Sequence, residues 1–481
     1  MKDSKLFNLF KTFNEQEFKN FEKFIDSPYY NKGRDLLPFF KVLKYFYPDF
    51  ESKDLSSKYI FNKLYPGKSF NPERSENLIR TLSSHLFRVC KEYLVILELE
   101  FAKSKKKYLL LNQLRKKNLY KEFDRECSDL PDDVISNSGK GSVGYFVDNY
   151  HLCAVKRDCS LNRDFFQESF EFTVKASENL ITAALISAYK FEDEKNLAKA
   201  YNVKIQNNII QDLLDNLNSD NLISEMKKNN AGHHEYLQVF HAIYLMNRFN
   251  DNTGYYFKLK ELLKSYSSVF GQSENYVLWN VMLTYCGVNK LKPEESFQLY
   301  KYMLDNDVYK LSAKENFHIV LFRNIVINSS SIGKFKWLEE FINNYSGELH
   351  ENHRDNMRYY SMAYLCFARS EFEKALEHIL SIKYNLFLFK LDLRILQLKT
   401  YFELGYYEEG LSLVSSLSTY LSNTKEFAEY IKDSIRNFVK CMKELIRLRT
   451  GVQIKDNDIF ILKKSAQSIL HTNLSEWLTK K

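Results

Sequence analysis

The segments SEFEKALEHI, which begins at Ser370, and GYYEEGLSLV, which begins at Gly405, match each other at an offset of 35 residues. Each follows about a dozen residues in which apolar side chains recur at helical spacing. In both segments a small residue closes one helix and an aromatic residue follows two positions later. A second small residue, Ala375 or Gly410, comes three positions after the aromatic one, where it would let two helices pack closely. The pattern predicts two consecutive helical hairpins over residues 359–418.

A third segment, GKFKWLEEFI, extends the pattern toward the N-terminus. It begins at Gly333, 37 residues before Ser370, and Leu338 stands where the other segments have a small residue. Ser312 and Glu315 have the spacing of a capping box, which predicts the start of this unit. The three segments together resemble the tetratricopeptide repeat, a helical hairpin of roughly 34 residues that stacks into a superhelix. Over 312–418 this resemblance implies an α-solenoid of hairpins.

The distribution of helix breakers favours helices along the whole chain. Six of the seven prolines lie within the first 131 residues, and neither Pro nor Gly occurs between Tyr145 and Ala231. Strand hairpins would ordinarily need turn residues there. The 38 Phe and 33 Tyr residues recur mostly at helical spacing beside Leu and Ile, which is typical of core packing. The sequence therefore predicts an all-α protein.

A chain of 481 residues is too long for one ordinary core, so several domains or one extended array are expected. Composition, charge and turn residues suggest six parts. They are an N-terminal helical module at 1–101, a basic helical hairpin at 102–130, a loop or linker at 131–144, an irregular helical array at 145–311, tetratricopeptide-like hairpins at 312–422 and C-terminal capping helices at 423–481.

The cysteines and the apolar runs bear on the compartment. Seven widely spaced cysteines with no CxxC pair are typical of core thiols in a reducing compartment. The first residues interrupt their apolar positions with charges, unlike a secretory signal. The longest uncharged runs fall short of a membrane span. We therefore expect a cytoplasmic protein with no membrane span.

Local signatures of catalysis are thin. His350 and His353 lie beside Glu348 and Glu351, but their setting is that of polar residues between helices. His234, Gln238 and His241 would share one helix face, yet the HExxH spacing is absent. The GKGSVG segment at 139–144 lacks the spacing of a P-loop. The sequence predicts no catalytic residues, no metal ligands and no cofactor, so we expect the chain not to be an enzyme.

The function expected from this architecture is that of a non-enzymatic scaffold or adaptor. A protein or peptide partner would lie in the groove of the array, held by apolar and aromatic anchors with polar clamps at the rim. The first helix of each hairpin would line that groove. The candidate groove residues are Arg323, Asn324, Arg358, Tyr359, Arg394 and Lys399.

The alternative is a nucleic-acid-binding regulator that uses the basic N-terminal region, with the repeats as a sensing or partner-binding domain. A short helix that ends at Leu64 and a long helix from Pro72 onward could form a helix-turn-helix, although we favour a helical hairpin with a solvated face. The net charge is +8. This hypothesis requires that the following residues gather on one face: Arg80, Arg88, Lys103, Lys106, Lys107, Arg115 and Lys116.

A second basic surface is expected on the long helix at about 424–449. Its cations fall within an arc of about 80° at roughly 100° per residue, with no acid at those positions. Such a stripe could meet phosphates or acidic side chains, or could simply be solvated. Its members are Lys432, Arg436, Lys440, Lys443 and Arg447.

Overall fold

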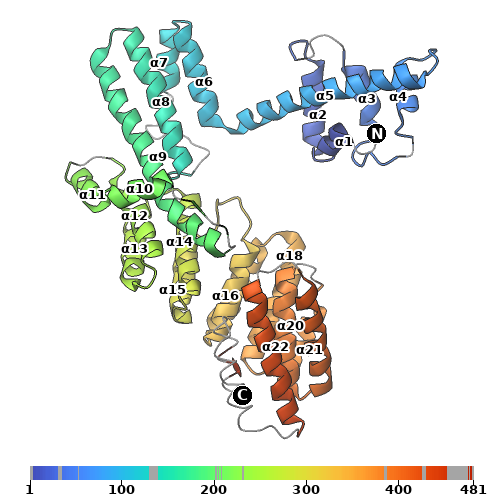
Figure 1. Cartoon of the computed structure of the whole chain (residues 1–481), viewed down its shortest axis with the longest axis vertical. Coiled ribbons are helices and arrows are strands. Elements are labelled where there is room, and N and C mark those ends of the chain that lie inside the picture. The colour runs from blue at the N-terminus through green and yellow to red at the C-terminus, as the bar shows by residue number, and fades with distance from the viewer. Residues whose placement is uncertain are drawn as a thin grey trace. The chain divides into compact units, whose positions relative to one another are not determined.

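The computed structural model describes residues 4–30, 35–52, 54–128, 139–200, 203, 205–206, 208–229, 232–383, 387–424, 429–451, 475 and 477–478. Every regular element among these residues is a helix, which confirms the all-α prediction (Figure 1). The chain divides into two compact units. The first comprises Met1–Asn137 and Asp148–Ala176, and the second comprises Ser138–Val147 and Ser177–Lys481.

The N-terminal helices of the first unit enclose an aromatic core. Asn14 and Glu17 form the predicted capping box, since each backbone N–H donates to the other residue's side chain at 2.9 Å. The ring of Phe10 lies 5.3–5.9 Å from five other Phe rings, all of them in the same core. The helices are α1 (Lys5–Phe10), α2 (Glu15–Asp26), α3 (Leu37–Lys44), α4 (Ser57–Leu64) and α5 (Pro72–Phe101).

Four further helices follow α5, and the first unit includes α6, α7, the part of α8 from Asp148 onward and the part of α9 up to Ala176. Leu111, Phe123, Leu152 and Cys159 form a small core between α6, α7 and α8. The predicted linker at 131–144 lies largely outside the described residues, and its last residues are a turn that leads into α8. The helices are α6 (Lys103–Lys116), α7 (Tyr120–Ser128), α8 (Val143–Asn162) and α9 (Phe166–Ala200).

The second unit continues with helices that pack in sequence-adjacent pairs. Pro293 occupies the first turn of α15, as predicted. The sequence did not predict α11, which is short and polar. The helices are α10 (Ile209–Asn216), α11 (Ser219–Lys228), α12 (His234–Arg248), α13 (Thr253–Ser265), α14 (Gln272–Val288) and α15 (Pro293–Asp305).

The last part of the second unit contains the three segments on which the hairpin prediction was based. The final helix expected at 456–477 lies mostly outside the described residues, but Trp477 and Leu478 pack on the core formed by α20, α21 and α22. The helices are α16 (Ile319–Ser331), α17 (Phe335–Tyr345), a 3₁₀ turn (Ser346–Glu348), α18 (Glu351–Ala368), α19 (Phe372–Ser381), α20 (Phe387–Leu404), α21 (Tyr407–Asn423) and α22 (Glu429–Arg449).

The capping box predicted at Ser312 and Glu315 is wrong. These residues lie in a turn, and α16 begins only at Ile319. Between the turn and the helix, Phe317 is buried against an aromatic cluster, and its backbone N–H donates to the carbonyl of Glu348 at 2.9 Å. Burial of this one ring holds the segment extended, so tertiary packing overrides the local capping pattern.

Seven turns between consecutive helices of the described residues share one backbone form. A residue with positive φ follows the first helix, and the next N–H donates to the carbonyl five residues earlier, at 2.9–3.0 Å. This is the Schellman motif. The predicted small residues Gly333, Ser370 and Gly405 occupy its left-handed position, whereas four other turns use residues that the sequence pattern did not single out. The seven left-handed residues are Asn118, Asp164, Lys290, Asp307, Gly333, Ser370 and Gly405.

Replacing Ser370 with glycine is expected to stabilise the protein. Ser370 has φ of 64°, a conformation that costs an L-residue roughly 1 kcal/mol and glycine almost nothing. We expect a gain of about 0.5 kcal/mol in the free energy of unfolding, measured by urea denaturation with circular dichroism. The control is Ser416→Gly at an exposed position inside α21, which should lower it by about 0.5 kcal/mol. Equal signs for the two variants would contradict the assignment.

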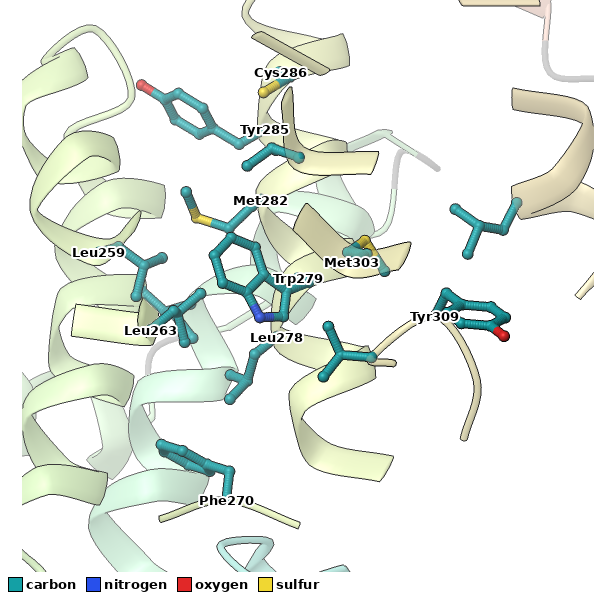
Figure 2. Packing of buried hydrophobic residues seen from close by; sticks show 14 of the residues in the cluster. Leu259, Leu263, Phe270, Leu278, Trp279, Met282, Tyr285, Cys286, Met303 and Tyr309 are labelled. Atoms are coloured by element: carbon teal, nitrogen blue, oxygen red, sulfur yellow. The ribbon is translucent and has the colours of Figure 1, made fainter. Parts of the chain in front are cut away.

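One large hydrophobic core runs through the second unit from Tyr145 to Phe389. Figure 2 shows its part around Trp279, which lies among side chains of α13, α14 and α15. Trp279 is fully buried, and its ring centroid is 4.4 Å from that of Tyr302. The close-packed rings and aliphatic side chains confirm that the aromatic residues here serve the core.

Candidate functional site

The candidate groove residues lie on the first helices of three successive hairpins, α16, α18 and α20. Arg323 of α16 forms a bidentate ion pair with Asp392 of α20. Its Nη2 donates to Oδ1 at 2.6 Å, and its Nε donates to Oδ2. Tyr360 of α18 donates its hydroxyl to Oδ2 of Asp392 at 2.8 Å. One carboxylate therefore joins all three helices. We call Arg323, Tyr360 and Asp392 the Arg323 network.

The Arg323 network is largely buried, and the charge of Arg323 is paired with that of Asp392 within it. Tyr360 is fully buried, and Asp392 is also buried. Burial opposes the charge of Arg323, but the hydrogen bonds and charge of Asp392 outweigh it and raise the pKa of the guanidinium. Burial, followed by the negative charge of Asp392, raises the pKa of Tyr360 well above its ordinary value. The pKa shifts therefore favour a charged Arg323 and a protonated Tyr360, and the contacts of the network position the three helices.

Arg323 and Asn324 are brought together by this arrangement. Nη1 of Arg323 donates to Oδ1 of Asn324 at 2.8 Å, so the guanidinium is engaged on both sides. Both residues are half-buried. Arg323 therefore joins the first helices through contacts between them, and Asn324 lies beside the network.

Arg358 and Tyr359 lie on a different face of α18 from Tyr360. Both are exposed, Tyr359 by 41%. The ring of Tyr359 is 6.0 Å from the imidazole of His378 in α19. These two residues are accessible to a partner.

Arg394 and Lys399 are half-buried and pack on aromatic rings. The guanidinium of Arg394 lies 5.3 Å from the ring centre of Tyr420 in α21. The ammonium of Lys399 lies 4.7 Å from the ring centre of Phe367 and 5.1 Å from that of Trp477. The six candidate groove residues are thus placed on three helices, and a hydrogen bond joins the side chains of Arg323 and Asn324.

Sequence reasoning missed Asp392 and Tyr360, which complete the network. Arg323 and Asp392 are 69 residues apart, and neither lies in a local motif. One signal was present: Asp392 has the helical spacing of Phe389 and Leu396, which places it on an apolar face of α20, where an unpaired charge would be costly.

The seven basic residues of the N-terminal region are spread over α5 and α6. Arg80 precedes the end of α5 by 21 residues, which corresponds to about 30 Å of helix. Lys107 pairs with Glu126 at 2.5 Å, and Arg80 pairs with Glu76 at 3.5 Å. Arg115 lies 3.8 Å from Asp158. Arg88, Lys103, Lys106 and Lys116 are exposed.

The basic stripe of α22 is largely neutralised. Lys432 is buried and pairs with Glu429 at 2.8 Å, and Arg436 pairs with Glu429 and Asp433. Arg447 pairs with Glu444 at 3.3 Å. Only Lys440 and Lys443 of the stripe have no acidic partner within the part of the chain that is described. The sequence argument considered one line of the helix and overlooked acids three positions away on the neighbouring line.

Two of the histidines considered in the sequence lie at a helix cap and in the lining of a cavity. His350 caps α18, where its Nδ1 accepts from the N–H of Asn352 at 3.4 Å. His241 and Gln238 line a cavity of about 190 Å³ between α11, α12 and α13, together with Asp220 and Lys258. Burial, more than the charge of Lys258, lowers the pKa of His241, while Asp220 opposes this effect. Gln238 accepts a hydrogen bond from Tyr266 at 3.1 Å.

The GKGSVG segment is a packed turn. Gly141 has φ of 96°, and a Cβ there would lie 2.6 Å from the ring of Phe270. The N–H of Gly271 donates to the carbonyl of Lys140 at 2.9 Å. The glycines therefore serve close packing of the turn against the region that precedes α14.

Within the described ranges, no group of three or more His, Cys, Asp or Glu side chains is placed to hold a metal ion. No described helix combines the length and apolar character needed to cross a membrane. Comparison with known proteins found no matching family model, no matching curated protein and no matching solved structure.

Proposed function

We propose that the chain is an α-solenoid of tetratricopeptide-like hairpins that acts as a non-enzymatic scaffold for a protein or peptide partner. The observation that carries this proposal is the Arg323 network. A buried ion pair between helices is costly to desolvate, and removing one partner leaves an uncompensated charge. Its gain here is geometric, because it fixes the spacing of three successive first helices. A surface whose shape is fixed before binding loses less entropy when a partner docks.

The partner would lie along the first helices. Asn324 is half-buried beside the network, and Tyr359 is exposed one helix further along. A tyrosine supplies large contact area and a hydrogen-bonding tip, which suits an anchor at an interface. Arg358 beside it would favour a partner with acidic residues near its apolar anchor.

Site-specific photo-crosslinking tests this proposal. A benzophenone amino acid is placed at position 324 or 359 of the full chain, which is then irradiated in lysate of its own organism, with and without nuclease. We expect one protein to be crosslinked from both positions in both conditions. The control position is Leu380, which is exposed on the second helix α19. Crosslinking from position 380 but not from 324 or 359 would place the partner on the second helices and contradict the proposal. Loss of the crosslinked protein after nuclease treatment would favour nucleic-acid binding.

A further inference from the structure

Two neighbouring turns of the first unit expose large apolar side chains. They are the turn between α6 and α7, residues 116–121, and the turn between α8 and α9, residues 161–166, which we call the double-turn tip. Its apolar members are 42–58% exposed. They are Leu119 in the first turn and Leu161, Phe165 and Phe166 in the second.

One arginine holds the two turns together. The guanidinium of Arg163 lies 5.5 Å from the ring centre of Tyr120 and 4.6 Å from that of Phe165, so it is shared between the two turns. It also donates from Nη1 to Asp124 of α7 at 2.7 Å. Figure 1 shows both turns at the same end of this group of helices. The exposed side chains therefore form one patch.

The backbone of the tip is well defined. Asn118 and Asp164 adopt positive φ, and both turns close with Schellman hydrogen bonds, from Leu119 to Leu114 at 3.0 Å and from Phe165 to Ser160 at 2.9 Å. Ordered turns that keep several large apolar side chains in water are unusual in a monomer, because such patches mark interaction surfaces.

The charges of the tip indicate its occupant. The two turns contain Lys116, Lys117, Lys121 and Arg163 against Asp164 alone, so four cations minus one anion leave +3. The three lysines are exposed. Apolar side chains at the ends of helices, surrounded by lysines, suit insertion into the headgroup region of an anionic membrane. A nucleic acid would leave the apolar centre uncovered.

We infer that the double-turn tip docks on the surface of a membrane that contains anionic lipids. Leu119, Phe165 and Phe166 would enter the interface, and Lys116, Lys117 and Lys121 would contact lipid phosphates and carboxylates. This inference is independent of the proposed scaffold function, which depends on α16, α18 and α20 in the second unit. It describes peripheral attachment, which requires no spanning helix.

Vesicle co-sedimentation of the purified full chain tests the inference. The probes are vesicles of phosphatidylcholine alone and of phosphatidylcholine mixed with phosphatidylserine. We expect binding to the mixed vesicles that weakens with salt, and little binding to the neutral ones. The double variant Leu119→Ser, Phe166→Ser should bind about 10-fold more weakly or worse, because it removes two inserted side chains. Ile209→Ser, at an 82% exposed position of α10, should bind as the unaltered chain does.

Charge variants complete the test. Lys116→Gln with Lys117→Gln should weaken binding about 5-fold per lysine, whereas Lys227→Gln with Lys228→Gln on α11 should not. Absence of binding to the mixed vesicles overturns the inference, as does binding that the Leu119 and Phe166 changes leave intact. Concentration-dependent self-association that these changes abolish, without vesicle binding, would assign the tip to a second copy of the chain and also overturn it.

Discussion

Asp392→Asn is expected to lower the free energy of unfolding by about 3–5 kcal/mol. The change keeps the shape of the side chain but removes the negative charge that Arg323 requires. The guanidinium would remain largely buried with no anion beside it, since Nη2 and Nε of Arg323 both donate to Asp392. Urea denaturation followed by circular dichroism would measure the loss.

A double variant separates the charge from the packing. Arg323→Met combined with Asp392→Leu replaces the ion pair with apolar side chains, and such replacements are often neutral or stabilising. We expect the double variant to recover most of the stability lost in Asp392→Asn. If the double variant has as low a free energy of unfolding as the single variant, the stability would depend on the polar network itself and not on avoiding an unpaired charge.

Trp279→Ala is the second change with a large expected effect, a loss of about 3–5 kcal/mol. Trp279 is fully buried in the continuous core of the second unit, and its ring packs on Tyr302. Removing the indole would leave a cavity that neighbouring helices could fill only partly. The same urea denaturation would measure the loss.

Trp279→Phe provides the matched control. The indole N–H of Trp279 is buried and has no hydrogen-bond partner among the described residues, so the phenylalanine removes an unsatisfied donor while it keeps most of the ring. We expect a loss of about 1 kcal/mol or less. Trp337→Ala, at a half-buried position of α17, should fall between the two. A loss in Trp279→Ala no greater than in Trp279→Phe would show that the core collapses around the missing side chain.

The helices could be predicted from the sequence because each depends mostly on its own periodicity. The sequence predicted an irregular helical array at 145–311, and α12, which spans His234–Arg248, is one of its helices. Ala375 and Gly410 were expected to permit close packing, and both are buried. A Cβ on Gly410 would lie 3.0 Å from Ile446 of α22. Local spacing was sufficient for these features.

The candidate site was harder to predict because its contacts cross long stretches of sequence. The position of Arg323 on a first helix suggested a groove residue, but its partner Asp392 lies two hairpins later and reverses that interpretation. Ser312 failed for a related reason, since the burial of Phe317 is decided by the aromatic cluster around it. Periodicity identifies which face is apolar, but it does not identify the residue across the interface.

The recurring Schellman turn also bears on how such a chain can change in evolution. Each turn is closed by hydrogen bonds within six residues, so it makes no demand on the length of the helices that flank it. From Lys290 to Gly333 is 43 residues, from Gly333 to Ser370 is 37 and from Ser370 to Gly405 is 35. The extra residues between Lys290 and Gly333 lie largely in the connection between α15 and α16, residues 306–318, so a difference in length is absorbed between turns of the same form. When the spacing between these turns changes in evolution, the sequence can lose its regular repeat length while the Schellman turns themselves are kept.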